Sequence, residues 1–198
     1  MCSSDLFGAG VDVITTGDHI WRRKETRQYL KDNPNVLRPA NMPEEAPGSG
    51  HTIVKAGDGT EVGVINVQGR TFMSPSDCPF HAAERSLQAL SERVRIIIVD
   101  IHAEATSDKM AMGRFLDGRV TAVRGTHTHV QTADEQIFPG GTAYITDVGM
   151  VGPYESILGR RVESVVSAFS TQLPTRFEVA TGDVRMGGVF VEADPATG

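Results

Sequence analysis

Residues 95–101 constrain the fold of this chain more than any other segment. They read Arg-Ile-Ile-Ile-Val-Asp-Ile, an almost unbroken series of β-branched side chains. A strand of this composition is usually buried on both faces, so helices or a second sheet are expected to cover it. Strand-like and helix-like segments alternate along the rest of the chain, and this order predicts an α/β domain.

The other predicted elements follow from periodicity and from turn residues. Strands are expected at residues 11–16, 51–55, 61–67, 95–101, 120–124 and 142–146, and helices at 20–31, 79–93, 106–115 and 155–169. The turn Gly57-Asp58-Gly59 favours a hairpin between the second and third strands. Residues 34–50 are rich in proline and are predicted to be a loop. A terminal hairpin is expected between residues 176–180 and 188–192, which suggests that the sheet is mixed or that two sheets stack.

Three predicted strands end directly in turns that carry histidine. These turns contain Asp18 with His19, then His102, then His127 with His129. In open α/β sheets ligands bind at the carboxyl ends of the strands, so these turns are expected to meet although they are far apart in sequence. Imidazole and carboxylate groups together suit a transition metal. The sequence therefore predicts a metal site at one edge of the sheet.

Each of these residues also has a simpler interpretation. A single histidine is more often an exposed or structural side chain, and only the repetition at three strand ends favours a metal. The His-x-His pair would place both rings on one side if its backbone were extended. Asp18 is either ordinary turn chemistry after a glycine or a carboxylate ligand that leaves His19 free as a proton donor. Asp100 and Glu104, which flank His102, either cap a turn or orient the ligating imidazoles.

Longer motifs around these turns resemble the YmdB-like bacterial metallophosphoesterases, a branch of the calcineurin-like metallophosphoesterases. The matching stretches are 17–21, 35–41, 68–72, 100–107, 125–134, 144–150 and 152–154. The resemblance covers nearly the whole chain from Gly8 onward. It implies a sandwich of two stacked mixed sheets flanked by helices, in a single domain over residues 1–198. It also implies hydrolysis of phosphodiesters, with 2′,3′-cyclic nucleotides opened to 3′-nucleotides as the favoured reaction.

The resemblance also assigns roles to the histidine-bearing turns. It implies two divalent metal ions, with iron or manganese favoured by the family. Asp18, His102 and His127 would hold one ion, and His129 would belong to the other. His19 would be the catalytic histidine near the leaving group. Asp18 stands where the family more often has asparagine, and its added negative charge predicts tighter metal binding.

The same resemblance predicts that the chain is a fragment. Members of the family begin with two strands whose Asp-glycine and Glu-Asn turns supply further metal ligands, and these turns have no match in the sequence. Residues 1–5 do not fit the family, and a further strand is expected after the C-terminus. The fragment could then be inactive, and one alternative is a catalytically impaired regulatory module that binds nucleotides or RNA. Another is a mononuclear metal hydrolase of non-phosphate esters.

Composition and charge limit the partners. The formal net charge of −6 argues against broad contact with duplex DNA and leaves a small nucleotide or an RNA end as the expected substrate. No apolar run approaches the roughly 20 residues that span a bilayer, and the N-terminus does not read as a signal peptide. Cys2 and Cys78 form no disulfide or thiolate pattern. We therefore predict a cytoplasmic enzyme without a membrane partner, and homo-oligomerisation stays open.

Overall fold

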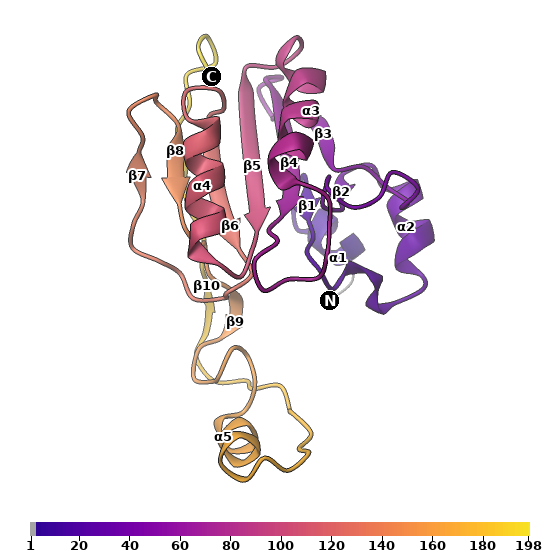
Figure 1. Cartoon of the computed structure of the whole chain (residues 1–198), viewed down its shortest axis with the longest axis vertical. Helices are drawn as coiled ribbons and strands as arrows, with labels where there is room; N and C mark the ends of the chain where they lie inside the picture. The colour runs from indigo at the N-terminus through magenta and orange to yellow at the C-terminus, as the bar shows by residue number, and fades with distance from the viewer. Residues whose placement is uncertain (1–2) are drawn as a thin grey trace.

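A six-stranded mixed sheet forms the centre of the computed structural model, which describes residues 3–198 (Figure 1). The strand order is β3-β4-β5-β6-β8-β7. The bounds are β3 His51–Lys55, β4 Glu61–Gln68, β5 Ile96–His102, β6 Ala122–Thr126, β7 Gln136–Ile137 and β8 Ala143–Ile145. The four inner strands are parallel, whereas β3 and β7 pair antiparallel at the edges. The α/β class and the mixed sheet are thus confirmed, and Cys2 lies outside the described residues.

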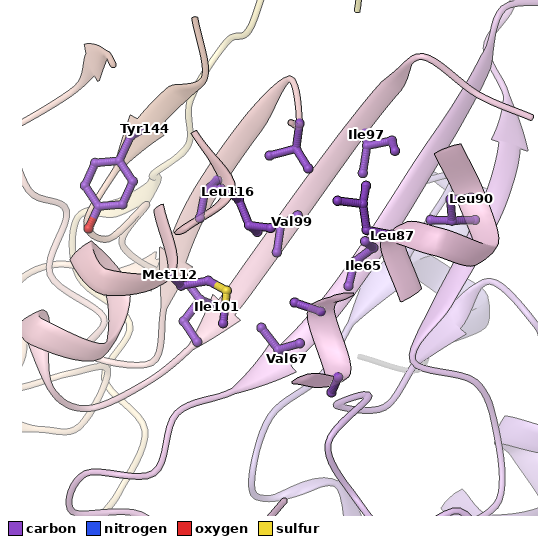
Figure 2. Close-up of a cluster of buried hydrophobic side chains, with 14 of the residues drawn as sticks. Ile65, Val67, Leu87, Leu90, Ile97, Val99, Ile101, Met112, Leu116 and Tyr144 are labelled. Carbon is purple, nitrogen blue, oxygen red and sulfur yellow. The ribbon is translucent and has the colours of Figure 1, made fainter. Parts of the chain in front are cut away.

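Helices α3 (Pro79–Ser91) and α4 (Thr106–Leu116) lie on the same face of this sheet (Figure 1). Alternate residues of β4 and β5 point towards them and form the main core (Figure 2). The core includes Ile65, Val67, Ile97, Val99, Ile101, Leu87, Leu90, Met112 and Leu116. The β-branched run of β5 is therefore buried as predicted on the helix side. On the opposite side Ile96 and Ile98 are only partly buried, and residues 189–195 line cavities against that face.

Two smaller sheets complete the strands of the described residues. β1 (Ile14–Thr15) pairs in parallel with β2 (Val36–Leu37), and β9 (Val151–Pro153) pairs antiparallel with β10 (Val184–Met186). The predicted hairpin between residues 176–180 and 188–192 was wrong. Residues 178–180 instead hydrogen-bond with the turn at 159–161, and β10 takes β9 as its partner.

Two predicted helices are shorter than expected. Residues 20–31 divide into a 3₁₀ turn, η1 (Ile20–Arg22), and α2 (Thr26–Asp32), because Arg23 between them is extended. The helix predicted from residue 155 begins only at Val162, as α5 (Val162–Thr171), because Leu158 and Gly159 both have positive φ. The short elements α1 (Ser3–Gly8), β2, β7, β9 and β10 were not predicted, and β2 lies within the segment 34–50 that was predicted to be a loop.

Helix α5 projects away from the sheet at the end of an extended arm (Figure 1). None of the helices in residues 3–198 combines the length and the hydropathy needed to cross a membrane. The single domain over residues 1–198 stays a prediction.

Candidate metal centre

The three histidine-bearing turns meet at the carboxyl edge of the parallel strands. His102 is the last residue of β5, and it lies level with Thr126, the last residue of the neighbouring β6. His127 therefore follows directly beside it. The segment after β1 reaches the same edge because the Asn66 side chain of β4 donates a hydrogen bond to the Thr16 carbonyl at 2.7 Å. This arrangement brings Asp18 to the two histidines, as the sequence predicted.

The donor atoms of Asp18, His102 and His127 all lie within 4.8 Å of one another. Asp18 Oδ1 is 3.2 Å from His102 Nε2 and 3.8 Å from His127 Nδ1. The two ring nitrogens that face each other, His102 Nε2 and His127 Nδ1, are 3.0 Å apart. Two imidazole nitrogens and a carboxylate oxygen at these separations are a donor set that fits one divalent transition metal. We call these three residues the triad.

Hydrogen bonds behind His102 decide which of its nitrogens carries the proton. The Thr126 hydroxyl donates to Asp100 Oδ1 at 2.8 Å, so it has only lone pairs to offer His102 Nδ1 at 3.0 Å. His102 Nδ1 must then be the protonated nitrogen, and Nε2 presents a lone pair to the triad. Asp100 Oδ2 is itself fixed by the Thr15 hydroxyl at 2.5 Å. Asp100 thus acts on His102 through Thr126 rather than by direct contact.

Glu104 holds His127 in a corresponding way. Its Oε2 lies 3.0 Å from His127 Nε2, so that nitrogen donates and Nδ1 is left with a lone pair. Two lone pairs and the Asp18 carboxylate consequently converge on one point. Such an arrangement is repulsive by itself, and a cation at that point would relieve the repulsion.

The charges in the triad agree with this picture. Burial alone would raise the pKa of the Asp18 carboxyl, but the nearby imidazoles of His102, His19 and His127 outweigh burial, so the pKa is lowered. Burial lowers the pKa of His102, partly opposed by Asp100. Asp18 is therefore ionised and His102 neutral at neutral pH, which are the forms in which each can bind a metal.

His19 and His129 lie beside the triad but outside it. Both line the same cavity of about 370 Å³, together with Gly17, Glu104, Thr128 and Leu158. His19 Nδ1 is 3.4 Å from Asp18 Oδ2, and its Nε2 accepts a hydrogen bond from the Arg22 guanidinium at 3.0 Å. The ring of His19 is 62% exposed. It therefore stands at the mouth of the cavity.

The expectation of extended backbone at His127 and His129 was wrong. Their φ angles are 101° and 68°, so both residues adopt a left-handed conformation that non-glycine residues rarely take. Thr126, Arg22 and Leu158 were also missed as parts of this site. Thr126 carried a signal, because it immediately precedes His127 in a strand-end turn, but Arg22 and Leu158 carried none.

Gly17 allows the close approach on which the triad depends. A Cβ atom built on this residue would lie 2.1 Å from His102 Nε2 and 2.3 Å from His102 Cε1. No larger residue fits there unless the imidazole moves. The glycine before Asp18 therefore has a packing role at the site besides its role in the turn.

Comparison with known proteins places these observations in a family. A family model described as "YmdB-like protein" matches residues 2–198. The chain is 52% identical over 192 residues to a protein of Bacillus subtilis (strain 168) named 2′,3′-cyclic-nucleotide 2′-phosphodiesterase, an alignment that covers 97% of this chain and 72% of that protein.

Two crystal structures are similar in fold. One is of a hypothetical protein from Thermus thermophilus, with a TM-score of 0.84 and 44% identity, covering 92% of this chain and 71% of that one. The other is of a phosphatase from Mycoplasma pneumoniae, with a TM-score of 0.79 and 34% identity, covering 90% and 65% respectively.

Proposed function

The chain belongs to the YmdB-like protein family, and we propose that it is a metal-dependent phosphodiesterase that opens 2′,3′-cyclic nucleotides to 3′-nucleotides. The name of the Bacillus subtilis relative, 2′,3′-cyclic-nucleotide 2′-phosphodiesterase, supports both the reaction and the substrate. The observation that carries the proposal is the convergence of two imidazole lone pairs and the Asp18 carboxylate, each oriented by hydrogen bonds from behind. Donor atoms that are oriented in this way suit a site that holds a cation.

Asp18, His102 and His127 would hold one divalent ion, and His129 would contribute to a second from the same cavity. Manganese or iron is the proposed metal, in keeping with imidazole and carboxylate donors. When bound, such ions supply positive charge that polarises a phosphoryl group and makes water a stronger nucleophile.

His19 is the side chain placed to supply a proton to the leaving group. In the reaction a water oxygen bonds to phosphorus, the bond between phosphorus and the ribose O2′ breaks, and O2′ takes up a proton. Asp18 engages His19 Nδ1, so the proton must be delivered from Nε2. Arg22 occupies Nε2 in the structure and cannot accept a proton, so it must release the ring before His19 acts.

Arg22 is exposed and lies next to the cavity through its contact with His19. A guanidinium released at this position can instead contact the phosphate of the substrate, since paired N–H donors match phosphate oxygens. The volume of the cavity, about 370 Å³, suits a small ligand such as a mononucleotide or the end of an RNA strand.

The test is hydrolysis of 2′,3′-cyclic AMP with Mn²⁺, with 3′-AMP separated chromatographically from 2′-AMP. We expect 3′-AMP as the product and no turnover of 3′,5′-cyclic AMP. His81→Ala removes an exposed histidine of α3 and serves as a control that should keep full activity. Binding of the nucleotide without any hydrolysis would favour the regulatory-module alternative and contradict the proposal.

A further inference from the structure

A buried ion pair lies behind the turn that carries His127 and His129. Lys109 of α4 and Asp147, which follows β8, are 1% and 0% exposed, and Lys109 Nζ is 2.7 Å from Asp147 Oδ2. A charged pair is costly to bury, and replacing it by packed apolar side chains is often neutral or favourable for stability. Its presence therefore calls for a role other than stability alone.

The ion pair fits behind the turn because residue 125 of β6 is glycine. A Cβ on Gly125 would lie 1.7 Å from the Thr146 carbonyl oxygen and 2.7 Å from Lys109 Cδ. The lysine stem and the end of β8 therefore pass directly against the backbone of β6. This packing brings the ion pair to the point where β6 leads into the turn with the two histidines.

Besides Lys109, the Asp147 carboxylate also accepts hydrogen bonds from Thr128, the residue between the two histidines. Its Oδ2 accepts hydrogen bonds from the Thr128 hydroxyl at 2.6 Å and from the Thr128 backbone N–H at 3.1 Å. Its Oδ1 accepts from Gly149 N–H at 2.8 Å. Burial would raise the pKa of Asp147, but the hydrogen bonds from Lys109, Thr128 and Gly149 outweigh it and keep the pKa below its usual range.

The residues on either side of Thr128 are the ones with left-handed backbones. His127 has φ 101° and His129 has φ 68°. Such conformations are unfavourable for non-glycine residues and persist only when surrounding contacts enforce them. Both Thr128 contacts to Asp147 act at the centre of this strained turn, so they can help to enforce it.

We propose that Lys109 and Asp147 are positioning residues that clamp Thr128 and thereby hold His127 and His129 in the orientations needed for metal binding. Lys109 neutralises the buried carboxylate, and the carboxylate fixes the turn from behind. This inference rests on the proposed function, because the positions of His127 and His129 affect metal binding only if these histidines bind metal. Neither residue touches the triad donors in the structure, so the clamp acts through Thr128.

The clamp can be weakened without removing the ion pair. Thr128→Val deletes the hydroxyl that reaches Asp147, whereas Thr128→Ser keeps it. A third variant, Thr142→Val, removes a different buried hydroxyl, which donates to the Val120 carbonyl at 2.7 Å near the other end of β8. This variant controls for loss of stability from a buried hydrogen bond, since it lies far from the strand ends that form the triad.

The measurements are Mn²⁺ affinity by titration calorimetry and the visible absorption spectrum of bound Co²⁺, on the full chain. We expect Thr128→Val to bind Mn²⁺ about 10- to 100-fold more weakly and to change the Co²⁺ spectrum. Thr128→Ser should match the parent protein in both. Thr142→Val should lower the unfolding temperature and leave affinity and spectrum unchanged.

A Thr128→Val variant with the affinity and Co²⁺ spectrum of the parent protein would overturn the clamp. So would an equal loss of affinity in Thr142→Val, because the effect would then follow stability alone. His127→Ala distinguishes failure of the clamp from failure of the proposed metal site. If His127→Ala binds Mn²⁺ normally, the proposed metal site fails; if it loses Mn²⁺ while Thr128→Val does not, only the clamp fails.

Discussion

Gly17→Ala tests whether the close packing at the triad matters. The added Cβ would lie 2.1 Å from His102 Nε2, about 1.3 Å short of the 3.4 Å at which ordinary contact begins. The imidazole must therefore move by about that distance or rotate away from Asp18. Loss of the contacts that orient a metal ligand typically weakens metal binding by about 10- to 100-fold, and a 100-fold loss corresponds to about 2.7 kcal/mol. We expect Mn²⁺ affinity to fall by about this factor.

The backbone of Gly17 is not left-handed, so alanine introduces no strain other than this contact. Overpacking of this kind lowers the free energy of unfolding by about 1–3 kcal/mol. Gly57→Ala is the matched control, because a Cβ there meets no atom within 4 Å and its φ is not positive either. It should leave affinity unchanged and raise stability slightly.

The assay is calorimetric titration of Mn²⁺ into both variants, with thermal unfolding measured on the same samples. A Gly17→Ala protein that binds Mn²⁺ as tightly as the Gly57→Ala protein would refute the reasoning from packing. It would mean that His102 does not contribute a donor atom from the position it occupies in the structure.

Three further outcomes follow from the structure. His19→Ala should keep Mn²⁺ affinity within about threefold but lower single-turnover hydrolysis by about 10²- to 10⁴-fold, since it lies outside the triad; equal loss of both would contradict its role as proton donor. Leu87→Ala, which removes a core-facing side chain of α3, should lower the free energy of unfolding by about 2–5 kcal/mol in urea titrations while Mn²⁺ affinity stays unchanged. Burial would raise the pKa of Asp108, but the hydrogen bonds that it accepts from Thr71 and Arg70 outweigh burial, so the pKa is lowered. Ionised Asp108 therefore stabilises the fold fully above about pH 4, and this stabilisation is lost as the pH falls through the lower pKa of the folded protein. Asp108→Asn should therefore be less stable at neutral pH and lose less stability on acidification, and parallel pH profiles of the two proteins would argue against this.

Local pattern was enough to predict the centre of the fold. The β-branched run of β5 and the helical spacing in α3 are signals that tertiary contacts reinforce, and both elements formed nearly where expected. The pairing of β9 with β10 was not predictable in the same way. It joins two segments that are far apart in sequence, and the chain between them includes a turn at Leu158 whose positive φ no local rule favours for leucine.

The proximity of His102 and His127 was predictable for a topological reason, whereas Asp18 reaches them from a separate two-stranded sheet. Parallel strands bring their carboxyl ends to one edge, so residues after β5 and β6 had to be neighbours once the strands were recognised. The contacts that orient the donor atoms could not be predicted from the sequence. The hydrogen bond from Thr126 to Asp100 depends on the register of two strands, and the left-handed backbone of His127 depends on contacts made by Asp147 from the segment after β8.

The central claim is that Asp18, His102 and His127 hold a divalent metal. It is tested most directly by elemental analysis of the protein after loading with Mn²⁺ and removal of free ions, for the parent chain, His127→Ala and His81→Ala. We predict that His127→Ala loses most of the bound manganese and that His81→Ala retains as much as the parent chain. Full retention of manganese by His127→Ala would contradict the account.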